Sequence, residues 1–379
     1  MEYSRLETYI DDLCTLKGVP GCEAVIHRGY EEIFRYRAGC SDYEKKVPMK
    51  GDEIFILYSC TKPITAVAGM RLVEEGKLGL DDPVSMYLPP FADVYLRKEG
   101  QKVKPQKPML IRHLFTMTAG MDYNLHSSPM RELVRSTQGK AGNREIACAK
   151  AQEPLHFEPG ERYLYSFCHD VLAAVIEVVV NQSFGDYLQQ LVFLPLGMAD
   201  TYFCVPEEKK HRIAAQFMYQ EREGLVPLER NNRLQITPNH ESGGAGLFST
   251  VNDYAAFAVT MANGGVSPNG YRLLKKETVD LLRTEQLSSF AKDTTFSCSA
   301  GPGYGYGLGV RTLIDRSGGQ RSSLGEFGWC GAAGSYILMD PAQKISIVFA
   351  MHVNNWPKMV GSYYSPIRDM VYDILEINL

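Results

Sequence analysis

The order of strand-like and helix-like segments constrains the fold of this chain more than any other feature. Strand-like runs occur near the amino terminus, in "GCEAVIHRG" and "EEIFRYRAG", and their separation by Gly29–Tyr30 predicts a hairpin. Similar patterns return near the carboxyl terminus, in "YGYGLGVRTLI", "EFGWCG", "GSYILMDP" and "KISIVFAMHV". Helical patterns joined by proline- and glycine-rich loops fill the middle of the chain. Strands at both ends with helices between them favour one antiparallel sheet built from both ends.

These segments predict an α/β fold of the α+β kind, in which an antiparallel sheet of about five strands is flanked by helices. Residues 1–80 and 240–379 would form the sheet domain, and residues 81–239 would form a mainly helical domain. Residues 4–17 and the segment "IRDMVYDILEIN" have the apolar spacing of helices. A chain of 379 residues is long enough to bury a large core.

Composition and charge exclude several classes of function. The net charge of −4 provides no basic surface for nucleic acid or an anionic membrane, so neither partner is expected. No apolar stretch is long enough to span a bilayer, and the acidic amino terminus lacks the apolar region of a secretory signal. The nine cysteines are scattered without a CxxC pair, which is typical of reduced thiols. We therefore predict a cytoplasmic protein.

Only one type of catalytic motif is present. There is no HExxH, no Cys/His cluster with ligand spacing, no GxSxG elbow and no Walker loop, so no metal or cofactor is expected. What remains are two S-x-x-K sequences, Ser59–Lys62 and Ser289–Lys292. The second copy leads into the polar segment "AKDTTFS", and we interpret it as a chance occurrence.

The first copy has a context that favours chemistry. Ser59 and Lys62 follow the apolar run "IFILY" and precede "ITAVAGMRLV", a segment apolar enough to form a deeply packed helix. Side chains at i and i+3 share a helix face, so the hydroxyl and the amine can meet in a buried pocket. Burial would lower the pKa of Lys62 and leave a neutral amine able to accept the serine proton. The alternative is a serine that caps the helix beside a lysine that extends to solvent.

Four segments together resemble the serine β-lactamase and penicillin-binding-protein superfamily. "ILYSCTKPITAVAGMRLVEEGKLGLDDPVSMYLP" resembles its nucleophile helix, and "IRHLFTMTAGM" resembles its I-x-x-L-L-T-H-T-S-G-L segment. "FEPGERYLYS" resembles the loop that ends in the catalytic tyrosine, and "SGGAGLFSTVNDYAAFA" resembles a helix start downstream of it. The resemblance runs from about residue 18 to residue 353, with the segments in the superfamily's order.

Two departures narrow the resemblance within the superfamily. A class C β-lactamase would have Tyr-x-Asn, whereas this chain has Tyr165–Ser166–Phe167, and phenylalanine cannot make the hydrogen bonds of asparagine. A β-lactamase or D,D-peptidase would also have Lys-Thr-Gly on a strand beside the nucleophile. The matching segment here, "GWCGAAG" at residues 328–334, resembles the G-W-G-G-A-A-G of family VIII carboxylesterases and related acyltransferases. Their Y-S-x-x-x-D-V-L stretch is similar to "YSFCHDVL", although Cys330 replaces their usual glycine.

The resemblance implies a set of catalytic residues. Ser59 would attack an acyl carbonyl, while Lys62 and Tyr165 would relay the proton, with the lysine cation lowering the pKa of the phenol. The backbone N–H groups of Ser59 and Ala332 would form the oxyanion hole. The substrate would be bound by Trp329, Cys330, Gly331 and Phe167.

Several alternatives remain open at individual positions. Tyr163 is a second tyrosine in the same loop as Tyr165, and Trp329 is either a pocket wall or an ordinary core residue. Cys60 is a second nucleophile candidate, but because no histidine partner is placed beside it, we favour a packed small residue. His240 and Glu241 precede "SGGAG" and are candidates for the border of the cleft, without an assigned role.

The leading hypothesis is a serine hydrolase that forms an acyl-enzyme, namely a carboxylesterase or transacylase acting on a small-molecule acyl ester or thioester. A β-lactamase or D-amino-acid peptidase is the alternative within enzymes, disfavoured by the missing Lys-Thr-Gly. A catalytically inactive binding or scaffold protein of the same fold is the third hypothesis, and the intact Ser59, Lys62 and Tyr165 argue against it. The natural substrate, the acyl acceptor and the oligomeric state are not determined by the sequence.

Overall fold

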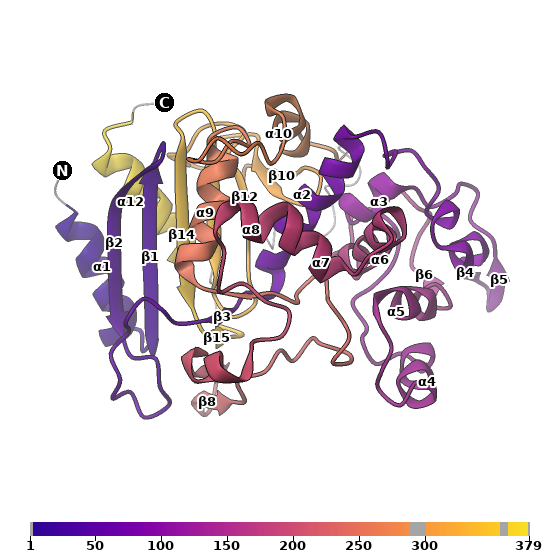
Figure 1. The fold of residues 1–379 in the computed structure, drawn as a ribbon, viewed down its shortest axis with the longest axis horizontal. Helices are drawn as coiled ribbons and strands as arrows, with labels where there is room; N and C mark the ends of the chain where they lie inside the picture. The colour runs from indigo at the N-terminus through magenta and orange to yellow at the C-terminus, as the bar shows by residue number, and fades with distance from the viewer. Residues whose placement is uncertain (1–2, 288–300, 357–362, 378–379) are drawn as a thin grey trace.

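The computed structural model describes residues 3–287, 301–356 and 363–377, and the second S-x-x-K sequence, Ser289–Lys292, lies outside them. Two parts are visible in Figure 1. One is a sheet built from the first and last parts of the chain, with helices on both faces. The other consists of helices and short strands from the middle of the chain.

The main sheet has seven antiparallel strands in the order β10-β11-β12-β13-β14-β1-β2. The amino-terminal hairpin pairs with the carboxyl-terminal strands through Val25 opposite Val348. The predicted α/β architecture with an antiparallel sheet from both chain ends is therefore confirmed. The strands are β1 (Gly21–Arg28), β2 (Glu31–Gly39), β10 (Tyr304–Tyr306), β11 (Arg311–Leu313), β12 (Phe327–Cys330), β13 (Tyr336–Asp340) and β14 (Ile345–Met351).

The sheet has more strands than the expected number of about five, in part because the segment "YGYGLGVRTLI" contains a turn. Gly309 adopts a φ of +88°, and the Gly307 N–H donates to the Val310 carbonyl at 2.8 Å. This turn reverses the chain, so β10 and β11 pair with each other as two short strands. A glycine readily adopts the positive φ that the turn requires, whereas most other residues do not.

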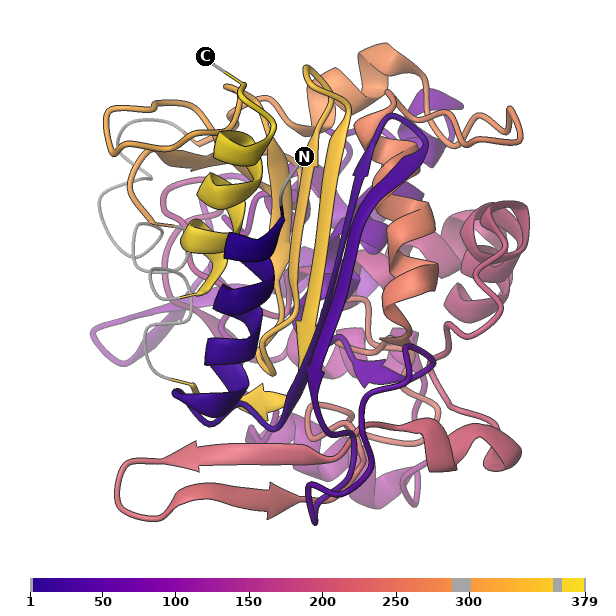
Figure 2. The same cartoon turned by 90° about the vertical axis from the view of Figure 1, so that its left-hand side faces the viewer.

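Successive residues of the central strands pack on opposite faces of the sheet, as the two-residue period of a strand requires. On one face, Leu338, Ile347 and Phe349 pack against two helices, α1 (Ser4–Thr15) and α12 (Ser365–Ile374). These are the predicted helices near the two ends of the chain, and they lie side by side in Figure 2.

The opposite face carries the elements that position the candidate site. Ile337, Val348 and Ala350 belong to a core that includes residues of three apolar helices. These helices are α2 (Thr61–Glu74), α6 (Cys168–Val180) and α9 (Val251–Ala262). Every residue of α2 from Thr61 to Met70 is buried, as the sequence predicted. Helix α9 packs on β13 and β14, and α2 packs between the sheet and α6.

The middle of the chain is not entirely helical. A hairpin of β7 (Gln216–Gln220) and β8 (Gly224–Leu228) pairs in parallel with β15 (Val353–Asn354), so part of the predicted helical domain joins the carboxyl-terminal segment. The predicted domain bounds remain a prediction. The other short strands are β3 (Phe55–Ile56), which pairs with β9 (Phe248–Ser249), and β4 (Tyr95–Lys98), β5 (Gln101–Val103) and β6 (Pro154–Leu155), which form a three-stranded sheet.

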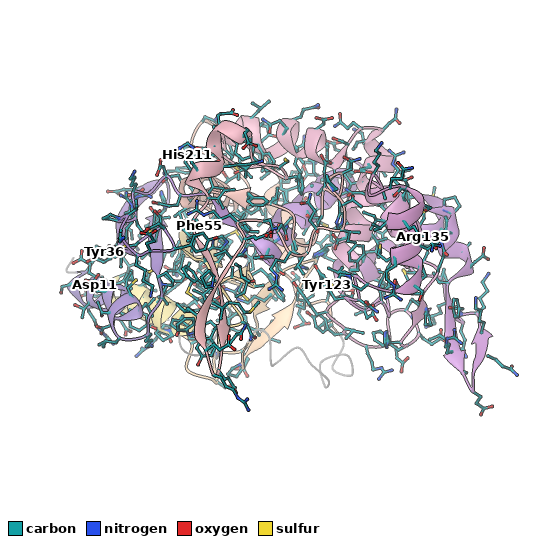
Figure 3. The ribbon with its side chains drawn as sticks, turned by 90° about the horizontal axis from the view of Figure 1, so that it is seen from below. Asp11, Tyr36, Phe55, Tyr123, Arg135 and His211 are labelled. Carbon is teal, nitrogen blue, oxygen red and sulfur yellow. The ribbon has the colours of Figure 1, made fainter. Side chains whose placement is uncertain are left out.

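The remaining helices are short. Figure 3 shows Arg135, on α4, at the opposite end of the molecule from Tyr36, with Tyr123 between them. The helices are η1 (Tyr58–Cys60), η2 (Val84–Met86), η3 (Pro89–Asp93), α3 (Ile111–Phe115), α4 (Ser128–Ser136), α5 (Asn143–Lys150), α7 (Phe184–Leu188), η4 (Gln189–Phe193), α8 (Leu194–Leu196), η5 (Glu207–Arg212) and α10 (Lys276–Leu282).

Within the described ranges no single helix has both the length and the apolar composition needed to cross a bilayer. One bent pair, Cys168–Val180 with Phe184–Leu196, passes that test together.

Candidate active site

The candidate nucleophile lies in a tight turn that leads into α2. Residues Tyr58–Cys60 form one 3₁₀ turn, and Tyr58 has a φ of +46°, an uncommon backbone conformation for a residue with a side chain. The buried Tyr58 hydroxyl donates to Gln216 Oε1 at 2.5 Å, which fixes this residue. Neither η1 nor α2 has a side-chain cap, so Ser59 is not a helix cap.

Two side chains, those of Lys62 and Tyr165, converge on the hydroxyl oxygen of Ser59. Lys62 Nζ lies 3.3 Å from Ser59 Oγ, and the Tyr165 hydroxyl donates to the same Oγ at 2.6 Å. Lys62 Nζ also donates to the Gly244 carbonyl at 2.7 Å. The Lys62 side chain is completely buried and does not extend to solvent. The structure thus brings together the three residues that the sequence analysis proposed as the nucleophile and the proton relay.

Burial sets the protonation of these groups. It lowers the pKa of Lys62 to about 8, although the negative charge of Asp170 acts in the opposite direction. Burial raises the pKa of Tyr165, and the hydrogen bonds with Ser59 and Trp329 oppose this only in part. The phenol pKa therefore moves in the opposite direction to the sequence-based expectation, because desolvation outweighs the other interactions. Near neutral pH the phenol keeps its proton, while the amine is the group that readily loses one.

Aromatic rings form one wall of the site. Tyr165 stacks between Tyr123 and Trp329, with ring centroids 5.7 Å and 5.8 Å apart and both pairs inclined by 15°. Lys62 Nζ lies 4.5 Å from the centre of the Tyr165 ring. Trp329 is 3% exposed and also meets Tyr306 edge-on at 5.3 Å. It is therefore both a core residue and a direct neighbour of Tyr165, and its contact with substrate remains a prediction.

The turn between β12 and β13 approaches the nucleophile segment closely. A Cβ atom on Gly331 would lie 2.3 Å from the Leu57 carbonyl oxygen, so only glycine fits there. The half-buried Cys330 ends β12, and the exposed Ala332 follows Gly331 in the turn. This arrangement places Cys330, Gly331 and Ala332, three of the predicted site residues, beside the nucleophile segment. Their roles remain predictions.

Cys60, Tyr163 and Phe167 occupy positions behind the site. The buried Cys60 thiol lies 3.7 Å from the Ser335 carbonyl oxygen, and burial raises its pKa well above the usual value, which disfavours a thiolate nucleophile. Tyr163 is buried and packs edge-on against Tyr306, at 5.3 Å between ring centroids, and it is Tyr165 that bonds to the serine. Phe167 is 1% exposed and stacks on His240 at 5.9 Å. Its predicted role in substrate binding is not tested by these contacts.

The structure adds residues to the site that sequence reasoning did not assign. Gly244 accepts a hydrogen bond from Lys62, and Tyr123 stacks on Tyr165. The buried Asp170 bonds to the loop that contains Gly244. A signal for Asp170 was present, because it is the aspartate of "YSFCHDVL". Nothing in the sequence showed where its carboxylate points.

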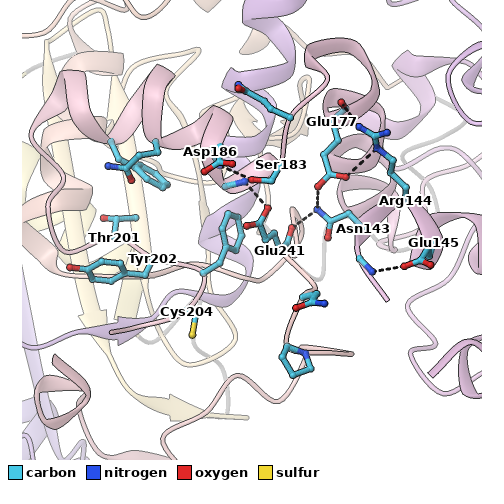
Figure 4. Close-up of a pocket in the computed structure, with 18 residues that line it drawn as sticks. Asn143, Arg144, Glu145, Glu177, Ser183, Asp186, Thr201, Tyr202, Cys204 and Glu241 are labelled. Atoms are coloured by element: carbon cyan, nitrogen blue, oxygen red, sulfur yellow. Dashed lines mark hydrogen bonds and ion pairs between the residues drawn. The ribbon is translucent and has the colours of Figure 1, made fainter. Parts of the chain in front are cut away.

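A separate pocket of about 760 Å³ lies between α5, α7 and the Thr201–Cys204 segment, and Figure 4 shows its lining. Glu177 accepts from Asn143 Nδ2 at 3.0 Å, and Glu241 accepts from the Gly185 N–H at 2.7 Å. Burial, with the nearby Glu241 charge, raises the pKa of Glu177 to about 7. None of the three converging residues lines this pocket. In the described part of the chain, no three His, Cys, Asp or Glu side chains are grouped to hold a metal ion.

Comparison with known proteins decides the family. A Beta-lactamase family model matches residues 6–365. The chain belongs to the beta-lactamase family. Esterase EstB from Burkholderia gladioli is 29% identical over 97% of this chain and 95% of the esterase. A putative D-alanyl-D-alanine carboxypeptidase from Escherichia coli is 26% identical over 93% of this chain and 80% of that protein.

Among solved structures, EstCE1 superimposes with a TM-score of 0.81 and 28% sequence identity, covering 97% of this chain and 98% of EstCE1. EstCE1 is described as a hydrolase with promiscuous acyltransferase activity. The resemblance to serine β-lactamases and penicillin-binding proteins found in the sequence is thus confirmed. The family and its members identify this beta-lactamase-family chain as a serine hydrolase-type enzyme.

Proposed function

We propose that this beta-lactamase-family protein is a carboxylesterase or transacylase that forms an acyl-enzyme on Ser59. The observation that carries the proposal is the convergence of Lys62 Nζ and the Tyr165 hydroxyl on Ser59 Oγ, at 3.3 Å and 2.6 Å, in a buried environment. An activated serine beside a general base is the arrangement that nucleophilic catalysis requires. The similarity to EstB and EstCE1 supports ester chemistry.

In the proposed mechanism, neutral Lys62 accepts the Ser59 proton as Oγ attacks the acyl carbonyl. The oxyanion is stabilised by the backbone N–H groups of Ser59 and Ala332. Because the Tyr165 phenol is protonated and bonded to the same oxygen, it can give its proton to the departing alkoxide and take one back from Lys62. Water or an alcohol then attacks the acyl-enzyme, and the same groups return the proton to Ser59.

The side chains around Tyr165 favour an uncharged substrate. In the part of the molecule that the structure describes, the rings stacked on Tyr165 are Trp329 and Tyr123, and neither offers a positive charge. A β-lactam or a peptide ending in D-alanine carries a carboxylate, which a lysine or arginine would bind better than an aromatic wall. A neutral small-molecule acyl ester or thioester fits this wall. The putative carboxypeptidase relative makes a peptidase the second candidate.

The proposal is tested by intact-mass measurement after incubation with a p-nitrophenyl ester or an activated phosphonate. One acyl or phosphonyl adduct is expected on the wild-type chain, and the adduct should disappear in Ser59→Ala. The chain supplies a matched control, because Ser289→Ala alters the serine of the second S-x-x-K sequence and should keep the adduct. An adduct retained in Ser59→Ala would place the nucleophile elsewhere.

A parallel assay separates the candidate substrates. Turnover of the p-nitrophenyl ester without turnover of a chromogenic cephalosporin supports the esterase or transacylase. Cephalosporin turnover at a comparable rate would favour the β-lactamase alternative. If neither substrate reacts and no adduct forms, the inactive member of the fold is supported instead.

A further inference from the structure

A buried carboxylate lies behind the candidate base. Asp170, in the first turn of α6, is 3% exposed. Its Oδ1 accepts hydrogen bonds from the Ser242 hydroxyl and from the Gly244 N–H, the latter at 3.3 Å. His240 Nε2 lies 3.3 Å from the same oxygen. One carboxylate oxygen therefore holds three successive parts of the 240–244 loop.

The hydrogen bonds of His240 fix its tautomer. Its Nδ1 accepts from the Ile236 N–H at 3.3 Å, so the lone pair is on Nδ1 and the proton is on Nε2. That Nε2–H points to Asp170, and Phe167 covers the imidazole ring. His240 thus acts as a buried donor to the carboxylate.

Gly244 connects this carboxylate to the lysine. Its N–H faces Asp170, while its carbonyl accepts the hydrogen bond from Lys62 Nζ at 2.7 Å. A Cβ atom at this position would lie 2.4 Å from Asp170 Oδ2, so glycine allows the carboxylate to approach the backbone. The neighbouring Gly243 carbonyl is also fixed, because it accepts from Thr65 Oγ1 at 2.7 Å. A shift of Asp170 would therefore move the carbonyl that directs the amine toward Ser59.

We propose that Asp170 and His240 are positioning residues that hold the Gly244 carbonyl against Lys62 and so keep the amine aimed at Ser59. This inference rests on the proposed role of Lys62 as the general base. Neither residue touches the reacting serine, so both act through the loop. A second consequence is electrostatic: the Asp170 charge partly offsets the effect of burial on Lys62.

The charges that face Lys62 come from several elements. Burial raises the pKa of Asp170, but the donors His240 and Ser242, together with Lys62, outweigh burial and keep the pKa below its usual value. Asp170 is thus ionised, whereas burial lowers the pKa of His169 to about 3 and keeps that imidazole neutral. Other groups that face Lys62 are the Cys60, Cys168 and Cys330 thiols and the Tyr123 and Tyr165 rings. The thiols have raised pKa values through burial and are uncharged.

The test is the pH dependence of acylation in Asp170→Asn, measured as the rate of adduct formation on Ser59 with a p-nitrophenyl ester. Without the negative charge, the ammonium form of Lys62 is less stable. The acidic limb of the profile should therefore move down by about one pH unit. The plateau rate should fall about tenfold, because the carbonyl that orients the amine is less firmly held.

The direction of the shift separates this role from a general loosening of the structure. Loosening would admit water to Lys62, raise its pKa and move the limb to higher pH. Asp253→Asn is the matched control, since Asp253 is a buried carboxylate that bonds to Thr201 and not to the 240–244 loop. The acidic limb of the Asp253→Asn profile should stay at the wild-type pH. An unmoved or upward-shifted limb in folded Asp170→Asn overturns the proposal.

Two variants of His240 test the positioning role while the Asp170 carboxylate is retained, and they serve if Asp170→Asn does not fold. His240→Gln can still donate to Asp170, whereas His240→Ala cannot. The plateau rate should fall about tenfold in His240→Ala and stay within about threefold of wild type in His240→Gln. Equal rates in the two variants overturn the proposal. Failure of the proposed function would be seen separately, as a wild-type chain that forms no adduct on Ser59.

Discussion

Two buried lysines show how the same side chain takes different roles within one molecule. Lys62 is 0% exposed and Lys150 is 2% exposed. Lys150 Nζ forms ion pairs with Asp122 at 2.5 Å and Glu153 at 2.7 Å. Lys62 Nζ instead bonds to a hydroxyl and to a backbone carbonyl, neither of which carries a charge.

The difference shows that burial alone does not produce a general base. Burial would raise the pKa of Asp122, but its hydrogen bond with Lys150 and its other partners keep it at about 2. That site is a closed ion pair, whose charges satisfy each other. At Lys62 the amine bonds to the Gly244 carbonyl and the Asp170 carboxylate bonds to the Gly244 N–H, so the charge of Asp170 offsets only part of the cost of desolvating the ammonium form.

The largest expected effect is on catalysis. Lys62→Met should lower the acylation rate about a thousandfold, because the group that accepts the Ser59 proton is lost. Lys62→Arg should be equally slow, since a guanidinium does not give up its proton near neutral pH. The rate is measured by adduct mass against time, with thermal melting as the check on folding. Retention of more than a tenth of the wild-type rate in folded Lys62→Met would refute the role of Lys62.

The matched substitution at the other lysine should affect stability instead. Lys150→Met leaves the partly buried Asp122 and Glu153 carboxylates without their cation, which should cost about 3 kcal/mol of unfolding free energy. Denaturant unfolding at pH 7 measures this loss. The acylation rate of the folded variant should stay within about threefold of wild type, because Lys150 does not contact the convergent residues. If the variant loses activity but keeps its stability, the contrast between the two lysines does not hold.

The smallest effect is the pH dependence of the wild-type enzyme. Acylation needs the neutral amine, so the rate should fall tenfold for each pH unit below about 8, the pKa of Lys62, and should level off above it. The rate should not fall again just above pH 8, because burial raises the pKa of Tyr165 and the phenol keeps its proton there. Single-turnover acylation measured between about pH 6 and pH 10 provides the profile. If the acidic limb of the profile were centred near the ordinary pKa of lysine, water would have to reach Lys62.

Much of the fold follows from local patterns. Short apolar runs predict the strands β1, β13 and β14, and the two-residue period of a strand places Ile337 and Leu338 on opposite faces of the sheet. The number of strands was harder to predict from the sequence, because the turn at Gly309 divides a segment that has continuous strand character. The β7–β8 hairpin was also missed, since its partner β15 lies more than a hundred residues away in sequence.

The candidate site also has features that local patterns predict and features that they do not. Ser59 and Lys62 are three residues apart on one helical segment, so their proximity is a local property, and Tyr165 was reached through a recognisable loop. The direction in which the pKa of Tyr165 shifts was not predicted, because it depends on how completely the phenol is buried. Long-range packing, which no local pattern encodes, sets that burial.

The sequence by itself determined the mixed fold, the S-x-x-K pair and the tyrosine that completes the proposed relay, since these depend on short-range spacing and on motif order. Only the tertiary structure decided which atoms surround the amine. Gly244 comes from a loop 182 positions from Lys62, and Asp170 comes from another helix. The pKa of a buried lysine is set by the solvent it loses and the charges it meets, and both are fixed only when distant segments pack together.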